Sequence, residues 1–131
     1  MSREHARAIW DAAVQAVRPE PLVRSALEAD RSLLDAPRVL VVGAGKAGPG
    51  MAAGLEAAFA GTLDRVEGIV NVPAGMLANL KRVRLHAARP AGVNEPTAAG
   101  VAGTEAMLRL LSTAGPDDVA VCLLSGGGSA L

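Results

Sequence analysis

The feature that most constrains this chain is the segment Val39–Gly48, with the sequence VLVVGAGKAG. Four apolar residues, three of them valine, lead directly into a loop of small residues that contains one lysine. Such a run is typical of a buried parallel strand that delivers a glycine turn to the start of a helix. Gly43, Gly45 and Gly48 match the spacing G-x-G-x-x-G, which indicates a dinucleotide. Lys46, between them, indicates a phosphoryl group instead.

The rest of the chain predicts an α/β layered domain over its 131 residues. Apolar periodicity predicts helices over 2–17, 22–28, 48–60 and 97–112, and strands over 38–42, 66–72, 83–86 and 119–124. This order implies a mostly parallel sheet, whose right-handed crossovers place the carboxyl ends of the strands at one edge. Both glycine loops are expected at that edge. A buried strand followed by a glycine loop is normally followed by a helix that covers the sheet. The chain is therefore expected to be truncated at its C-terminus.

Composition excludes several classes of function. Thirteen basic residues balance thirteen acidic ones, which argues against a nucleic-acid partner. No apolar run approaches the roughly 18 residues of a membrane span and no leader is visible, so a cytoplasmic protein with no membrane partner is expected. Because only 2% of the residues are aromatic, the core must consist of aliphatic side chains. The single cysteine, Cys122, is expected to be a small core residue.

The dinucleotide interpretation is only half satisfied. It requires an acidic residue at the end of the second strand, about 20 residues after the glycines, to hold a ribose. Residues 68–72 contain no carboxylate, and Glu67 begins the strand at the opposite edge. A match to three glycines alone is weak support for this class of ligand.

The phosphoryl interpretation uses both glycine loops. A glycine turn offers backbone N–H groups, the following helix adds its positive end, and Lys46 adds a mobile charge. The second loop, Ser125–Ser129, repeats this arrangement with two hydroxyls and three glycines. Two such loops at one edge suit a nucleoside triphosphate and an acceptor. Because the sequence has no cluster of metal-ligating residues, any metal is expected to be Mg²⁺ carried largely by phosphates. The plainer alternative is that the glycines only shape turns and that Lys46 points to water.

Further candidate residues lie near the ends of the second and third strands. Asn71 and Arg89 are the candidate substrate contacts, since Arg89 can hold a carboxylate in a bidentate fork. His86 is expected at the same edge. Asn94 and Glu95 are expected to cap the helix that follows.

Four segments in this order resemble the N-terminal domain of the glycerate 2-kinase family: VVGAGKAGPGMA, GIVNVPAG, RPAGVNEPTAAG and LLSGGGSAL. The resemblance covers essentially the whole chain. That family pairs this domain with a C-terminal domain often called MOFRL, and its members were long named hydroxypyruvate reductases. Many members carry an HPVPDE-like motif where this chain has RPAGVNE, so its histidine and aspartate are not reproduced here.

The resemblance implies a three-layer, Rossmann-like α/β/α domain over residues 1–131 and transfer of phosphate from ATP, with Mg²⁺, to the 2-hydroxyl of D-glycerate. It implies that Lys46 is catalytic and that Gly43 and Gly45 bind the nucleotide, together with the second loop: Ser125, Gly126, Gly127, Gly128 and Ser129. The MOFRL domain is absent, so the chain is expected to be poorly active alone. An NAD(P)-dependent reductase domain, a non-catalytic nucleotide-binding fragment and a homo-oligomer remain open.

Overall fold

The computed structural model describes residues 1–127 of the chain, so the predicted contacts Gly128 and Ser129 lie outside the described residues. The elements follow the predicted order, with two additional short helices, α3 and the 3-10 helix η1. They are α1 (Arg3–Ala16), α2 (Pro19–Glu28), α3 (Arg31–Leu34), β1 (Val39–Ala44), α4 (Gly48–Ala58), the 3-10 turn η1 (Leu63–Arg65), β2 (Val66–Pro73), β3 (Val83–Arg89), α5 (Ala98–Leu111) and β4 (Val119–Leu124).

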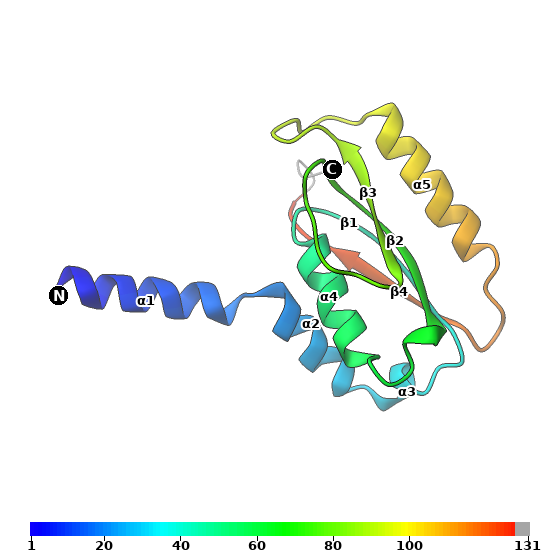
Figure 1. Ribbon diagram of the computed structural model, residues 1–131, viewed down its shortest axis with the longest axis horizontal. Helices are drawn as coiled ribbons and strands as arrows, with labels where there is room; N and C mark the ends of the chain where they lie inside the picture. Colours follow the sequence, from blue (N-terminus) through cyan, green and yellow to red (C-terminus); the bar gives the residue numbers. More distant parts are fainter. Residues whose placement is uncertain (128–131) are drawn as a thin grey trace.

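The four strands form one parallel sheet in the order β3-β2-β1-β4. Strand β1 is central, and its Val39 pairs with Val66 of β2 and Val119 of β4. Helix α4, backed by α2, covers one face of the sheet, and α5 covers part of the other (Figure 1). The predicted three-layer α/β/α fold is confirmed. All four strands end at the same edge, which we call the carboxyl edge.

The core lies between the sheet and α4. Valines on this face of β1 and β2 are fully buried, as are Leu55 and Phe59 of α4. The apolar spacing along residues 48–60 predicts that these two side chains point inward, and the structure confirms it. Aliphatic side chains dominate this layer, because the chain has almost no aromatic residues to place there.

The opposite face of the sheet is partly open. Helix α5 lies over β3 and β2, so among residues 1–127 no helix covers this side of β4. Cys122 is consequently exposed rather than a core residue, and Leu124 is 66% exposed. The apolar spacing along residues 97–112 also predicts that Val101 and Leu108 point inward, and this prediction is wrong, since both are more than half exposed on α5. An apolar strand sequence predicts burial, but the position of the neighbouring helix decides which face is covered.

Helix α1 projects away from the α/β body (Figure 1). Serine before a helical segment is a preferred N-cap, and the Ser2 hydroxyl does accept a hydrogen bond from the backbone N–H of His5 at 3.2 Å. None of the helical residues is buried, and Trp10 is 69% exposed. Within residues 1–127, no helix is long and apolar enough to cross a membrane.

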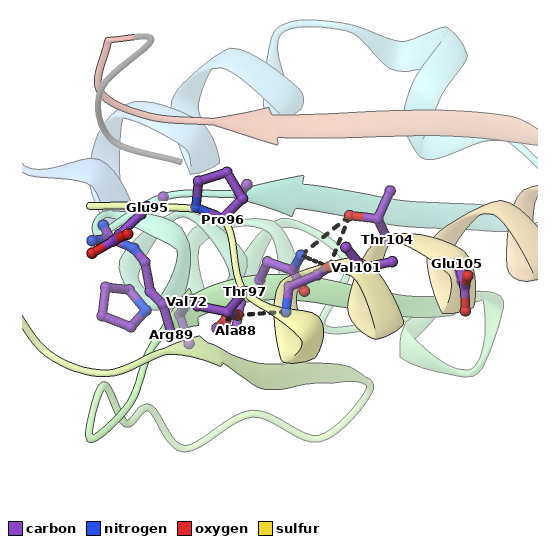
Figure 2. Close-up of a pocket in the computed structure, with 14 residues that line it drawn as sticks. Val72, Ala88, Arg89, Glu95, Pro96, Thr97, Val101, Thr104 and Glu105 are labelled. Carbon is purple, nitrogen blue, oxygen red and sulfur yellow. Dashed lines mark hydrogen bonds between the residues drawn. The ribbon is translucent and has the colours of Figure 1, made fainter. Parts of the chain in front are cut away.

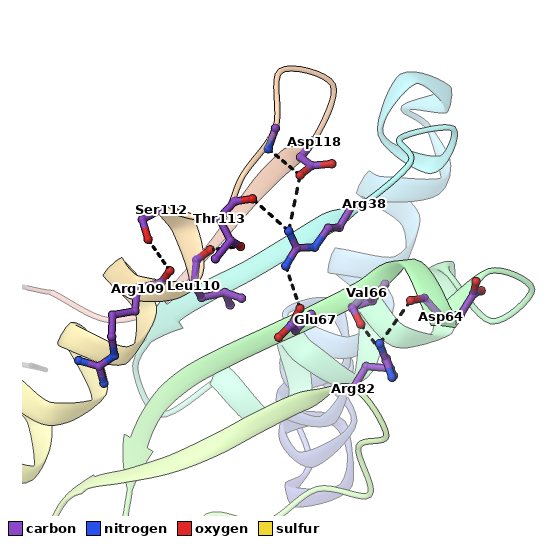
Figure 3. A network of polar contacts seen from close by, with 11 residues as sticks. Arg38, Asp64, Val66, Glu67, Arg82, Arg109, Leu110, Ser112, Thr113 and Asp118 are labelled. Atoms are coloured by element: carbon purple, nitrogen blue, oxygen red, sulfur yellow. Dashed lines mark hydrogen bonds and ion pairs between the residues drawn. The ribbon is translucent and has the colours of Figure 1, made fainter.

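The edge where the strands begin, the amino edge, is closed by charged groups (Figure 3). Arg38 forms an ion pair with Glu67 at 3.0 Å and a longer one with Asp118 at 3.7 Å. Its guanidinium also donates to the carbonyl of Thr113. Nearby, the buried carboxylate of Glu56 accepts hydrogen bonds from the backbone N–H groups of residues 81, 82 and 83 at 2.7–2.9 Å. This carboxylate fastens α4 to the start of β3.

Candidate functional site

The first glycine loop turns tightly where β1 meets α4, and packing explains each of its glycines. A Cβ atom on Gly43 would lie 2.1 Å from the carbonyl oxygen of Leu123 in β4. Gly45 has φ of +126°, in the region that favours glycine, and a Cβ there would lie 2.2 Å from Ser125 Oγ. A Cβ on Gly48 would lie 2.8 Å from a methyl group of Val70. The three glycines therefore bring two strands, the second loop and α4 together.

The second glycine loop begins at Ser125, which contacts the first loop directly. The Ser125 hydroxyl accepts a hydrogen bond from the backbone N–H of Ala47 at 3.1 Å. Its own N–H donates to the carbonyl of Ala44 at 3.2 Å. The prediction that both loops lie at one edge of the sheet is confirmed. Gly126 and Gly127, the next two predicted contacts, are exposed.

Lys46 stands on the outside of the first loop. Its side chain is exposed and makes no ion pair with any other residue in the range 1–127. It follows Gly45, which lines the pocket described next, but Lys46 itself does not line that pocket. The long, flexible lysine stem gives its ammonium group a wide reach over the carboxyl edge.

A pocket of about 350 Å³ opens at the carboxyl edge, between the ends of β1–β3 and the N-terminal half of α5 (Figure 2). Its wall includes Gly45 and both predicted substrate contacts, Asn71 and Arg89. The size and the largely apolar lining with a few polar groups are typical of small-molecule sites. The other lining residues are Ala44, Val72, Pro73, Ala88, Glu95, Pro96, Thr97, Gly100, Val101, Thr104 and Glu105.

Asn71 connects β2 to α5 at the pocket wall. Its Nδ2 donates to the carbonyl of Gly100 at 3.2 Å and lies 3.5 Å from Thr104 Oγ1 (Figure 2). Its Oδ1 is buried and accepts no hydrogen bond from the residues that the structure describes. An orphaned buried acceptor is rare in folded proteins and costs free energy. This oxygen lies against Gly103 of α5, where a Cβ atom would lie 2.0 Å from it.

Arg89 is buried beside the pocket, with only 6% of its surface exposed. Its guanidinium donates to the carbonyl of Val93 and to Oδ1 of Asn94. The arginine thus holds the loop that follows β3 against the end of the strand. The side chain of Asn94 accepts a hydrogen bond from Arg89 and does not cap α5, so the capping role predicted for Asn94 is wrong.

Thr97 is the residue that caps α5. Its hydroxyl accepts a hydrogen bond from the N–H of Gly100 at 3.0 Å and donates to the carbonyl of Ala88. The capping role predicted for Glu95 is therefore also wrong, and its side chain lies at the pocket instead (Figure 2). The sequence offered a usable signal, because threonine directly before a helical segment is a preferred N-cap.

His86 does not extend into the pocket. It lies in β3, and its Nε2 is 2.7 Å from the carbonyl of Ala99 at the start of α5. His86 is the last residue of the predicted strand, whereas the structure places it in the middle of β3, which continues to Arg89. The pocket-lining residues Thr104 and Glu105 lie on the exposed side of α5 and gave no signal in the sequence.

Of the two features that the dinucleotide interpretation requires, the structure has one and lacks the other within the described residues. The strand–glycine turn–helix context is present. The carboxylate that would hold a ribose is not found at the end of β2, where the residues are Asn71, Val72 and Pro73. Glu67 lies at the amino edge, as predicted, and the structure shows that it pairs there with Arg38. No group of three or more His, Cys, Asp or Glu side chains within residues 1–127 could hold a metal ion.

Fold and site together define an α/β domain with a ligand pocket at the carboxyl edge of a parallel sheet. The family described as Domain of unknown function (DUF4147) matches residues 5–131, and the chain belongs to this family. No solved structure matches the chain significantly.

Curated relatives give this family its biochemical names. The chain is 35% identical over 132 residues to a putative hydroxypyruvate reductase of Agrobacterium vitis, covering 99% of this chain. It is 32% identical over 149 residues to glycerate kinase of Homo sapiens and also to that of Bos taurus, covering 98% of this chain. The resemblance to the N-terminal domain of the glycerate 2-kinase family is confirmed. The chain spans 28% of the length of each of these relatives.

Proposed function

We propose that this chain is the N-terminal domain of an ATP-dependent kinase that phosphorylates the 2-hydroxyl of D-glycerate. The observation that carries the proposal is the exposed Lys46, which forms no ion pair within residues 1–127 and directly follows the pocket-lining residue Gly45. A mobile ammonium group at this edge suits the negative charge that spreads over phosphoryl oxygens during transfer. Family membership and the relatives named glycerate kinase support the same reaction.

The polar groups of the pocket suit a small hydroxy acid. Asn71 and Arg89 both line the wall, and Arg89 supplies a fixed positive charge there. In this proposal Asn71 and Arg89 contact the acceptor substrate. Lys46 and the exposed Gly126 and Gly127 contact the phosphates.

The metal in this proposal is Mg²⁺, bound mainly through the phosphates of ATP. This fits a chain whose residues 1–127 contain no cluster of metal-ligating side chains, since Mg²⁺ often takes few protein ligands and keeps phosphate oxygens and waters. When bound, Mg²⁺–ATP supplies the phosphoryl group. The role of this chain is to neutralise charge through Lys46 and to position the acceptor.

The second domain of the longer relatives completes the site in this proposal. Relatives about three and a half times as long, judged by the 28% that this chain spans, have room for a MOFRL-type domain across the carboxyl edge. The isolated chain is then expected to bind nucleotide weakly and to turn over little. D-glycerate, ATP and the second domain are the proposed partners.

A reductase is the alternative, supported by the name of the Agrobacterium vitis relative. It requires a nicotinamide dinucleotide on the first glycine loop. The end of β2 carries no carboxylate for a ribose, which favours the kinase. Tight binding of NADH together with no binding of Mg²⁺–ATP would contradict the kinase proposal.

Lys46→Ala tests the proposal, and Lys81→Ala is a matched control. Lys81 is also exposed, but it lies before β3 at the opposite edge. We expect Lys46→Ala to weaken Mg²⁺–ATP binding by about tenfold or more, measured by isothermal titration calorimetry. The free energy of unfolding should change by less than about 0.5 kcal/mol in either variant. Equal affinities for Mg²⁺–ATP in the two variants would argue against a phosphate contact at Lys46.

A further inference from the structure

The space above the second glycine of the first loop is already occupied. In a dinucleotide-binding turn, the second glycine of G-x-G-x-x-G lacks a side chain so that the pyrophosphate can approach the backbone. Here that residue is Gly45, and the position of its missing Cβ lies 2.2 Å from Oγ and 2.5 Å from the carbonyl oxygen of Ser125. The glycine therefore makes room for Ser125 of this chain.

The N–H groups at the entrance of α4 are also used within the chain. The N–H of Ala47 donates to Ser125 Oγ at 3.1 Å, and that of Gly48 donates to the carbonyl of Gly45 at 3.0 Å. The next residue, Pro49, has no N–H. Three successive positions at the start of this helix thus offer no donor to an anion, although a helix N-terminus is normally a ready site for a phosphate.

We infer that Ser125 is a specificity-determining residue that closes the first glycine loop to the pyrophosphate of a nicotinamide dinucleotide. A backbone hydrogen bond fixes the position of Ser125: its N–H donates to the carbonyl of Ala44, where the paired strands β1 and β4 end. Its hydroxyl accepts the hydrogen bond of the Ala47 N–H, which is a donor that a bound pyrophosphate would need. This inference concerns the ligand that the first loop excludes. It can therefore be tested separately from the proposed kinase reaction.

Hydrogen exchange at a single amide tests the contact. In the 131-residue chain labelled with ¹⁵N, Ser125→Ala should make the amide of Ala47 exchange at least about tenfold faster, since its hydrogen-bond acceptor is gone. Ser125→Thr keeps the acceptor oxygen and should restore slow exchange. Ser112→Ala is the matched control, because the Ser112 hydroxyl also bonds a backbone group but lies at the far end of α5. Equal exchange of Ala47 in the wild type and in Ser125→Ala would overturn the inference.

An NADH titration tests the exclusion itself. With millimolar NADH added to the wild-type chain, the amide resonances of Ala47 and Gly48 should not move. Concentration-dependent shifts of both resonances would show that a dinucleotide reaches the loop, and the inference would be wrong. Circular dichroism of each variant checks that it folds. If Ser125→Ala does not fold, the NADH titration of the wild-type chain still tests the inference.

Discussion

The two edges of the parallel sheet are held together by different kinds of contact. At the amino edge, charged side chains meet: Arg38 bridges Glu67 and Asp118, and the Glu56 carboxylate gathers backbone N–H groups. At the carboxyl edge, glycines allow backbones to approach, and Ser125 joins the two loops. The charges at the amino edge pair with one another, whereas the side chain of Lys46 at the carboxyl edge is exposed and forms no ion pair within residues 1–127.

The largest effect expected at the amino edge follows loss of the buried carboxylate of Glu56. Glu56→Ala leaves the N–H of Val83, which is buried, and those of the two preceding residues without an acceptor. We expect a loss of about 2–3 kcal/mol in the free energy of unfolding, measured by urea denaturation followed by circular dichroism. Glu28→Ala, which removes an exposed carboxylate paired only with Arg24, should cost no more than about 0.5 kcal/mol. Similar losses would mean that the carboxylate does not fasten α4 to β3.

The next largest effect on the free energy of unfolding is expected at the carboxyl edge, where a glycine packs closely against two valines. Gly48→Ala places a methyl group 2.8–3.0 Å from the side chains of Val70 and Val72. Because valine side chains are stiff, α4 must shift, at a cost of about 1–2 kcal/mol in the free energy of unfolding. Gly61→Ala is the matched control, since a Cβ there meets no atom within 4 Å. Thermal unfolding should show a clear loss for the first variant and almost none for the second; the reverse order would refute the packing argument.

The ion pairs of Arg38 should contribute less than the burial of Glu56. Its side chain is 34% exposed, and that of its partner Glu67 is 54% exposed. Arg38→Met keeps much of the apolar stem and should lower the free energy of unfolding by less than about 1 kcal/mol. The difference from the wild type should shrink in 1 M NaCl, where exposed charges are screened. A larger loss that is insensitive to salt would indicate a packing role for the arginine.

The smallest effect is a pH dependence at Asp30, before β1. The Ser32 hydroxyl donates to its carboxylate at 2.6 Å, which holds the pKa of Asp30 below its ordinary value, despite a small opposing effect of burial. Since the folded state then binds the proton less readily, this contribution to stability is present above about pH 3.9 and is lost as the pH falls through the lowered pKa. The urea midpoint should therefore fall slightly less between pH 7 and pH 3 in Asp30→Asn than in the wild type. An identical fall would exclude the contribution.

Much of this architecture follows from local sequence patterns. Apolar runs ending in glycine predicted β1 and β4, and the crossover rule placed both glycine loops at one edge, where Ser125 meets the first loop. Thr97, Asn94 and Glu95 show the limit of this approach. Asn94 and Thr97 are both preferred N-caps by residue type, and the loop held by Arg89 places Thr97 at the start of α5 while Asn94 contacts the arginine.

Burial on the outer elements could not be predicted either. Cys122 lies in an apolar strand, and Val101 and Leu108 lie in an apolar helix, yet all three are exposed. Sequence periodicity identifies an apolar face, but the position of α5 over β3 and β2 is a tertiary property. The pocket is likewise tertiary, since it brings together residues from three strands and one helix.

The projection of α1 has a practical consequence for spectroscopy. The only tryptophan of the chain, Trp10, lies on this helix and touches none of the core. A 14-residue helix without buried residues is marginal in water and is expected to exchange between helix and coil within microseconds. Intrinsic fluorescence therefore reports the fraying of one outlying helix, while the sheet can unfold without a change in tryptophan emission.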